Sequence, residues 1–460
     1  MKFRLPPALL ALLMAALFLL WNHGSAVSLT SGQELGYVSD EVWYVSSSRN
    51  MLREFWGLTA SSHEGNLSYA TVTALSFHDY LEAMDLLSRL DEPYRLVKAS
   101  YREELATGWP EAFALLASEE SLKRLEQLGG LRVYRGYPYP DHDGILEYLN
   151  LEHPPLAKYI LGLVLLADDR PPTWRIPSLL LGAAIVFLAY LTARKIFGEL
   201  AGLAAALFAA TDQTLRAMSM VAMLDIYLSF FTLLALYFAL TLGREASALA
   251  LGLAGSVKFS GFTPLLALLT VSFKNNPRKH WIILLPILTA SVFLALSAPV
   301  IVYLGGFEAW IEKILWAMRW YATARPTGPP STSPFGLLFG FNPFPLSFNP
   351  PLTATPNFLL TGMTIPLTLI FLPLALKGEI RGLGTCLAWF WTSYFTYLAV
   401  YLAGNTTLYT FYAVQFTPLA AVIGGGIVYL IFHPEKALEG LKAYLKLFRW
   451  AAGKPSSEDF

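Results

Sequence analysis

The chain has 460 residues, of which 55% are hydrophobic and only 14% are charged. This composition excludes an ordinary soluble protein and indicates that most of the chain is surrounded by lipid. The net charge is zero, so no polyanionic partner such as nucleic acid is indicated. The single cysteine, Cys386, excludes a disulfide framework and a thiolate metal cluster.

Hydrophobic segments recur along the chain, most of them close to the roughly 20 residues that a transmembrane helix requires. We therefore predict an all-α polytopic membrane protein with about ten transmembrane helices. The segments are Leu5–Trp21, Trp174–Phe197, Ala201–Ala210, Val221–Leu242, Ala246–Phe273, Trp281–Leu304, Asn357–Leu376, Leu383–Ala403 and Leu408–Phe432.

The first region, residues 1–21, begins with the cations of MKFR and continues as an apolar run. We interpret it as the first transmembrane helix, although the small residues that follow also suit a secretory signal with a cleavage site. With either interpretation the cations stay inside, and the chain from Asn22 onward emerges on the outer side.

Residues 22–172 then form a long outer loop, and its charged, Ala- and Leu-rich middle, Ser76–Gly130, predicts a small helical domain. Near its end, Leu156–Ala167 holds only about a dozen apolar residues, too few to cross a core of roughly 30 Å. We expect this segment to lie along the outer surface. Trp174–Phe197 then runs inward and places Arg194-Lys195 in the cytoplasm, as the positive-inside rule favours.

Residues 173–304 are the predicted transmembrane core. Within Ala246–Phe273, Lys258 interrupts the apolar run between Gly255 and Gly261, which predicts two short segments that meet at the lysine. A broken helix at membrane depth usually lines a cavity. The basic loop Lys274 to Lys279 is expected in the cytoplasm.

The last third continues the same plan. Residues 305–356 are rich in Pro, Gly, Ser and aromatics and predict an ordered outer lid without a sheet. Residues 357–432 supply three more spans, with the basic loop Lys377 to Arg381 on the inside. Residues 433–460 are a basic cytoplasmic tail that begins with an amphipathic helix.

Asp40-Glu41 lies on the predicted outer side, where a carboxylate can act as a general base. A helix N-cap is an equally physical interpretation of the same pair. Four further ionisable groups are candidates for holding a phosphate or lining a cavity: His153 and Lys158 beside two prolines, Arg175 at the entrance to a span, and Asp225 just inside one.

Lys258 and Gln415 are candidates of the same kind, because polar groups within spans usually face a cavity or a partner. Snorkelling is the alternative for Lys158 and Arg175. No glycine-rich phosphate loop is present, so an activated donor is expected to come from the membrane itself. A divalent metal is left open as a cofactor, since His63, His78, His142 and His153 match no ligand spacing.

In their order along the chain these motifs resemble the protein O-mannosyltransferases, the dolichyl-phosphate-mannose:protein mannosyltransferases of glycosyltransferase family 39 in the GT-C superfamily. The resemblance covers roughly Leu5 to Phe273 and is most specific in HPPLAK. It rests on Asp40-Glu41, His153-Pro154-Pro155-Leu156-Ala157-Lys158, Arg175, Met223-Leu224-Asp225 and Gly255-Ser256-Val257-Lys258-Phe259-Ser260-Gly261.

The resemblance implies an inverting transfer of a sugar, mannose in that family, from a polyprenyl or dolichyl phosphate to a protein Ser or Thr hydroxyl. Asp40 would be the base, and Arg175 with Lys158 would hold the phosphate. The site would face outward from the cell membrane, or into the endoplasmic reticulum of a eukaryote.

This sequence departs from the family in three ways. Its gap between Glu41 and His153 is long, Ser219-Met220 stands where family members often have Ser-Arg, with Arg216 as a substitute, and residues 305–356 are too short for the β-trefoil of eukaryotic members. The last departure suggests a prokaryotic, archaeal relative.

Two alternatives remain open. An aminoarabinose-type transferase shares the Asp-Glu pair and the helical plan but modifies a lipid acceptor. A transporter would use Asp225 and Lys258 as an ion pair at the membrane midplane, but the hydropathy shows no internal repeat of the transporter kind.

Overall fold

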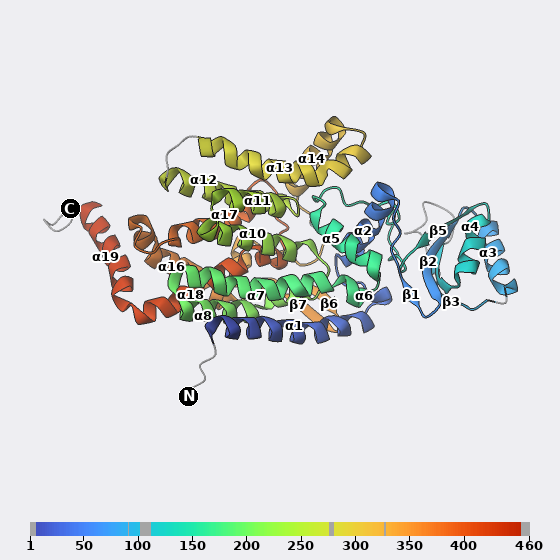
Figure 1. Cartoon of the computed structure of the whole chain (residues 1–460), viewed down its shortest axis with the longest axis horizontal. Helices are drawn as coiled ribbons and strands as arrows, with labels where there is room; N and C mark the ends of the chain where they lie inside the picture. The colour runs from blue at the N-terminus through green and yellow to red at the C-terminus, as the bar shows by residue number, and fades with distance from the viewer. Residues whose placement is uncertain (1–5, 91, 102–111, 276–279, 326–327, 452–460) are drawn as a thin grey trace.

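The computed structural model describes residues 6–90, 92–101, 112–275, 280–325 and 328–451, and most of the chain forms one elongated body (Figure 1). Long apolar helices run along its main axis. A small unit that contains a β-sheet occupies one end, and α19 lies at the other end (Figure 1). Most of the basic loop predicted at Lys274 to Lys279 lies outside the described residues, as do parts of Ser76–Gly130.

Five helical segments of the described chain are long and apolar enough to cross a membrane, or six if the bent pair α18 and α19 is one span. The all-α polytopic class is thereby confirmed for this body, but with fewer long spans than the predicted ten. The five are α1 (Pro7–Ser31), α6 with α7 (Pro171–Trp174, Ile176–Phe197), α10 (Leu224–Thr241), α13 (His280–Tyr303) and α16 (Phe358–Lys377).

The difference in number comes from helices that are apolar but short or interrupted. The predicted span Ala201–Ala210, for example, lies in a helix of only 13 residues, α8. Leu156–Ala167, which was not counted as a span, is one separate helix of 12 residues, α5. The remaining helices of the body are α2 (Glu41–Trp56), α8 (Glu199–Thr211), α9 (Gln213–Ser219), α11 (Arg244–Gly255), α12 (Pro264–Asn275), α17 (Leu383–Leu402), α18 (Thr417–Phe432) and α19 (Pro434–Ala451), with 3₁₀ turns η1 (Glu34–Gly36), η2 (Phe259–Phe262) and η3 (Thr410–Gln415).

The break predicted at Lys258 is confirmed. Helix α11 ends at Gly255, and Lys258 lies in extended backbone before η2. Both flanking glycines are required by close approach: a Cβ on Gly255 would lie 2.1 Å from the ring of Phe262, and one on Gly261 would lie 2.3 Å from the backbone of Ala254. The chain therefore folds back on itself here and leaves the lysine at a non-helical corner.

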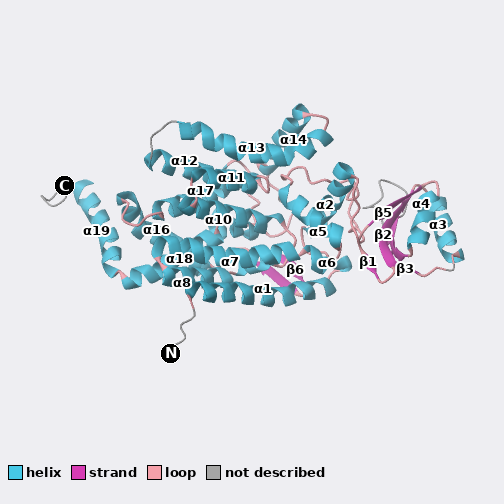
Figure 2. Ribbon diagram, in the orientation of Figure 1, coloured by secondary structure: helices cyan, strands magenta, loops and turns pink. Residues whose placement is uncertain are grey.

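The predicted helical domain within residues 22–172 is wrong, because its centre is a mixed α/β unit (Figure 2). Its main path is strand, helix, strand, strand, helix, strand, with the antiparallel order β5-β2-β4-β3, the arrangement of a ferredoxin-like plait. The elements are β1 (His63–Glu64), β2 (Leu67–Ala74), α3 (Phe77–Arg89), β3 (Tyr94–Tyr101), β4 (Ala112–Ala117), α4 (Glu119–Gln127) and β5 (Leu131–Arg135).

Central strand β4 explains the error. Its sequence AFALLA has high helix propensity, yet every residue is buried because both faces of the sheet are covered. One face packs on α3 and α4 through residues such as Phe113 and Leu115. The other face, with Tyr101 and Ala114, packs on the segment that contains Tyr139 and Ile145 and leads toward His153.

Residues 305–356 are also more regular than predicted. They form α14 (Phe307–Tyr321), α15 (Pro334–Phe339) and an antiparallel hairpin of β6 (Phe344–Phe348) and β7 (Pro351–Ala354). Helix α14 follows directly on α13 and packs beside it (Figure 1). The expectation of a lid without a sheet is therefore wrong for the hairpin, although the segment does cover a cavity.

Candidate active site

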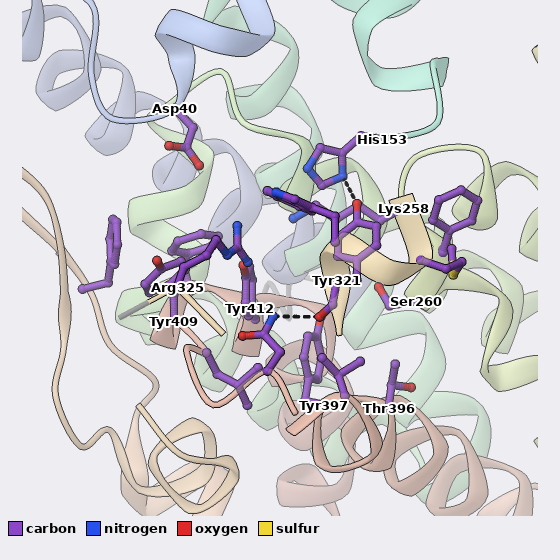
Figure 3. A pocket seen from close by; sticks show the side chains of 18 of the residues that line it. Asp40, His153, Lys258, Ser260, Tyr321, Arg325, Thr396, Tyr397, Tyr409 and Tyr412 are labelled. Carbon is purple, nitrogen blue, oxygen red and sulfur yellow. Dashed lines mark hydrogen bonds between the residues drawn. The ribbon is translucent and has the colours of Figure 1, made fainter. Parts of the chain in front are cut away.

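A cavity of about 380 Å³ lies among residues contributed by the start of α2, η2, α14, α17 and η3, and segments near them (Figure 3). Its ionisable polar groups include Asp40, His153, Lys258 and Arg325. Tyrosines form much of the remaining wall, namely Tyr44, Tyr321, Tyr397, Tyr409 and Tyr412.

Asp40 immediately precedes α2, but its side chain caps no backbone N–H of that helix. Asp40 therefore occupies the predicted N-cap position, but its carboxylate does not cap the helix. Within the described chain the carboxylate has no hydrogen bond or ion pair, and it lines the cavity. Burial raises the pKa of Asp40 to about 6, while Lys258 and Arg325 act in the opposite direction. A carboxylate with this pKa is mostly ionised at neutral pH and can accept a proton.

Glu41, the next residue, points elsewhere and does not line the cavity. Its Oε1 accepts a hydrogen bond from the backbone N–H of Ala222 at 2.8 Å, and its Oε2 accepts one from the N–H of Val38 at 2.8 Å. The same carboxylate holds Arg175 through two bonds, of 2.7 and 2.6 Å. Both groups of this ion pair are fully buried.

Arg175 is correspondingly occupied. Its five N–H donors are matched by five bonds: two to Glu41, and one each to the carbonyls of Ala26 and Gly36 and the hydroxyl of Thr30. Arg175 therefore does not line the cavity, and the prediction that it binds phosphate is wrong. Its bonds instead hold α1, α2 and α7 together. Arg216, the other arginine considered, donates to Asn22 and lies over the ring of Trp21.

Lys158 is also away from the cavity. Its ammonium donates to the carbonyls of Asn150 and His153, the latter at 2.9 Å, and the side chain is fully buried. Neither snorkelling nor phosphate binding describes this position. Lys158 instead fixes the turn that presents His153 to the cavity.

His153 lines the cavity. Its Nδ1 contacts the hydroxyl of Tyr321 (Figure 3). Its ring lies edge-on to that of Tyr44. Burial lowers the pKa of His153, and the nearby cations Lys258, Lys158 and Arg325 lower it further. The imidazole is therefore neutral at pH 7 and can form hydrogen bonds without adding charge.

Asp225 and Lys258 form a buried ion pair, with the ammonium 2.8 and 2.9 Å from the two carboxylate oxygens. Lys258 lines the cavity, whereas Asp225 lies behind it at the start of α10. The ammonium is also 5.1 Å from the ring centre of Tyr412. Asp225 thus holds one cation of the site in place.

Gln415 is buried outside the cavity wall. Its Oε1 accepts a hydrogen bond from Tyr397 at 2.7 Å, and its Nε2 donates to the carbonyl of Ser260 at 3.0 Å. It therefore links two cavity-lining residues on different elements.

Arg325 was not identified from the sequence. It follows α14, its guanidinium lies 4.1 Å from the ring centre of Trp320, and it has no ion pair among the described residues. A hydrogen bond from its backbone N–H to Thr407, 3.0 Å long, anchors this segment. The only sequence signal was an arginine after Trp320-Tyr321 inside a Pro- and Gly-rich lid.

The histidines considered as metal ligands do not converge. His63 and His142 lie in and beside the α/β unit, His78 lies on α3, and only His153 lines the cavity. In the described parts of the chain no group of three or more His, Cys, Asp or Glu side chains could hold a metal ion.

These features define a polytopic helical membrane protein with a cavity that contains several ionisable side chains. Residues 152–303 match the family model of the dolichyl-phosphate-mannose-protein mannosyltransferases, which confirms the predicted resemblance for this part of the chain. The matched region begins at Glu152-His153 and contains the Asp225–Lys258 pair.

Solved structures provide a second comparison. Apo ArnT from Cupriavidus metallidurans matches with 18% identity and a TM-score of 0.43 over 65% of this chain and 54% of that chain. The apo oligosaccharyltransferase of Archaeoglobus fulgidus matches with 13% identity and a TM-score of 0.49 over 94% of this chain and 52% of that chain. The chain thus spans about half the length of these structures. No curated protein matches it.

Proposed function

We propose that this protein is an inverting glycosyltransferase that moves one sugar from a polyprenyl or dolichyl phosphate to an acceptor hydroxyl. The observation that carries the proposal is the carboxylate of Asp40, which has no hydrogen bond or ion pair with the described residues and lies in the same small cavity as the cations Lys258 and Arg325. A cavity of about 380 Å³ suits a single sugar and its phosphate.

The chemistry is a single displacement. The acceptor oxygen attacks the anomeric carbon, the bond from that carbon to the phosphate oxygen breaks, and the acceptor proton passes to Asp40. The electron pair of the broken bond leaves with the polyprenyl phosphate. Attack opposite to the leaving group inverts the anomeric configuration.

Arg325 and Lys258 lower the barrier by stabilising negative charge that develops on the departing phosphate. Arg325 suits this role because no carboxylate of the described residues neutralises its guanidinium, which can hold two phosphate oxygens at once. Lys258 is partly neutralised by Asp225, so it contributes less charge and more fixed geometry.

We infer mannose as the sugar and a protein Ser or Thr as the acceptor, because residues 152–303 match a family described by that activity. We place the site on the outer face of a cell membrane, following the charge distribution of the loops. A lipid acceptor is the alternative outcome of the test below.

The test uses purified protein in lipid nanodiscs with mannosyl polyprenyl phosphate and a Ser/Thr peptide. Polyprenyl phosphate should be released only when the acceptor is present, and mass spectrometry should find one hexose on the peptide. Mannose on an added lipid instead would select the lipid acceptor. If the protein binds the donor but transfers mannose to neither the peptide nor the lipid, the proposed glycosyl transfer is rejected.

A further inference from the structure

Helix α19 lies across the end of the helical body that is remote from the cavity (Figure 1). Helix α18 follows η3, whose residues Phe411 and Tyr412 line the cavity, and it runs along the main axis of the body. The chain then bends by 105° from α18 into α19. Because the long apolar helices share the direction of this axis, α19 lies nearly parallel to the plane of the membrane.

The charges of α19 show that it does not continue α18 across the bilayer. Charged residues recur along all of its 18 residues, and a charged side chain in the hydrocarbon core is costly. They are Glu435, Lys436, Glu439, Lys442, Lys446 and Arg449. Helix α19 is therefore a surface helix at the end of the bundle.

One side of α19 exposes an apolar stripe. Leu438, Leu441, Leu445 and Phe448 follow one another at intervals of three, four and three residues, which places them on one face of the helix. These residues are between 51% and 68% exposed. Such a stripe is unfavourable in water and is typical of a helix that lies in a membrane interface.

Cations form a second strip beside the apolar stripe. Lys442, Lys446 and Arg449 each directly follow a residue of the stripe, so they lie roughly 100° around the helix from it. Lys442 and Arg449 are exposed, and from Gly440 to Ala451 the helix sequence contains no acidic residue. An apolar stripe beside a basic strip matches a bilayer surface on which anionic headgroups cover the acyl chains.

The third side of α19 is fixed to the protein. Gly440 is buried against α16 so closely that a Cβ on it would lie 2.3 Å from the carbonyl oxygen of Ile370. Lys436 donates to Glu379, in the turn after α16, at 2.7 Å. These contacts hold the helix across the bundle and leave its apolar stripe and basic strip facing outward.

Further cations lie at the same end of the body. A Cβ on Gly382, just before α17, would lie 2.7 Å from Leu240 near the end of α10 and 3.6 Å from Ile196 near the end of α7. The turns after these helices therefore meet at this end, where Lys195 and Arg381 are exposed. An anionic surface would meet cations here as well as on α19.

A second copy of the chain suits the apolar stripe less well than a bilayer does. In a symmetric contact between two stripes, each copy would place the same patch against the other. The basic strips of the two helices would then lie beside each other and repel. Anionic lipid instead supplies both the apolar and the negative groups that the two strips need.

We propose that α19 is an interfacial helix that docks on the bilayer and binds anionic phospholipid headgroups through Lys442, Lys446 and Arg449. The apolar stripe enters the upper part of the acyl chains, and the basic strip lies among the headgroups. This inference concerns the end of the protein opposite the cavity and does not depend on the proposed glycosyl transfer.

The first experiment locates the stripe with a fluorescent label on the full-length protein in nanodiscs. Cys386→Ala removes the only cysteine, and Leu445→Cys then gives one labelling site on the stripe. Lipids brominated on their acyl chains should quench this label, whereas iodide in the water should not. Glu82→Cys, an exposed site on α3, is the control and should show the reverse.

The second experiment compares brominated phosphatidylglycerol with brominated phosphatidylcholine as quenchers of the label at position 445. We expect the anionic lipid to associate at least about fivefold more strongly, the effect of one cation near an anionic surface. Lys442→Gln with Arg449→Gln should remove most of this preference. Arg89→Gln with Arg124→Gln removes the same charge from exposed positions on α3 and α4 and should leave it unchanged.

Quenching of the label by iodide, or equal association of the two lipids, would overturn the inference. So would energy transfer between two proteins labelled at position 445 without quenching by lipid, because a second copy would then cover the stripe. Thermal unfolding of each variant shows that it is folded. Sugar transfer is measured separately, so its absence would reject the proposed reaction and leave the lipid site in place.

Discussion

Asp40 and Glu41 are consecutive residues, but their carboxylates lie in two different surroundings. Glu41 lies with Arg175 in the protein interior, and Asp40 lies with Arg325 in the cavity. In the first, Arg175 has an acceptor for each of its five donors and is completely buried. In the second, Asp40 has no partner in the described chain, and Arg325 is stacked on Trp320 without a counter-ion.

The difference distinguishes two kinds of charged side chain in this molecule, those that stabilise the fold and those available to bind substrate. A buried charge whose bonds are all made within the protein cannot also bind substrate without breaking the fold. A charge left unpaired in a cavity costs stability, and that cost is recovered only when substrate binds. By this criterion Glu41, Arg175 and Lys158 stabilise the fold, and Asp40 and Arg325 are the groups that we propose to act on substrate.

The largest effect is expected for Asp40→Asn. Loss of the general base should lower kcat by about 10²- to 10⁴-fold, because this is the usual contribution of positioned proton transfer. The rate of polyprenyl phosphate release in the presence of acceptor measures it. Asp143→Asn, an exposed change, is the matched control and should keep full activity. Full activity of Asp40→Asn would remove Asp40 from the mechanism.

Glu41→Gln should lower the stability of the protein, whereas Asp40→Asn should not. It leaves Arg175 buried without its carboxylate, which costs about 3–5 kcal/mol in comparable cases. Thermal unfolding in detergent should therefore shift to a clearly lower temperature, while Asp40→Asn should unfold no earlier than wild type. A Glu41→Gln protein with wild-type stability would contradict the structural assignment.

Arg325→Met tests the cavity cation that has no ion pair among the described residues. It should lower kcat/KM for the donor by about 10- to 100-fold, the effect of losing a charge-assisted contact to phosphate in a partly open cavity. Arg319→Met removes an exposed arginine from α14 itself and serves as the control. Titrations with donor at saturating acceptor give kcat/KM for both variants. Equal kcat/KM values for the two variants would contradict the role of Arg325 in binding the donor phosphate.

The smallest effect concerns pH. Because burial raises the pKa of Asp40 to about 6, activity should be full above that pH and fall as the pH drops through it, when the base becomes protonated. Arg325 lowers this pKa, so Arg325→Met should move the acidic limb to higher pH. A pH profile of kcat/KM measures both; an unmoved limb in the variant would show that Arg325 does not act on Asp40.

Much of the helical plan could be predicted from the sequence, because hydrophobic length and charge report directly on the membrane. The break at Lys258 was visible for the same reason. The sheet was not, since AFALLA in β4 has the composition of a helix and becomes a strand only through partners far away in the chain.

The candidate site was predicted in part. Asp40, His153 and Lys258 line one cavity, although they come from distant parts of the sequence. Arg175 and Lys158 were placed there because a cation at a segment end resembles a phosphate ligand. Which donors are already occupied depends on tertiary contacts such as those to Ala26 and Gly36, and a sequence pattern does not contain them.

The α/β unit enters and leaves the helical body at almost one point. Ser62, just before it, accepts a hydrogen bond from Tyr69, and Gly136, just after it, donates to Tyr69, while a Cβ on Gly136 would lie 3.3 Å from the Cβ of Ala60. Residues 63–135 thus form a cassette with adjoining ends. Such a cassette can be exchanged, as a loop is, while the cavity and its cations stay unchanged, because every residue that lines the cavity lies outside the cassette.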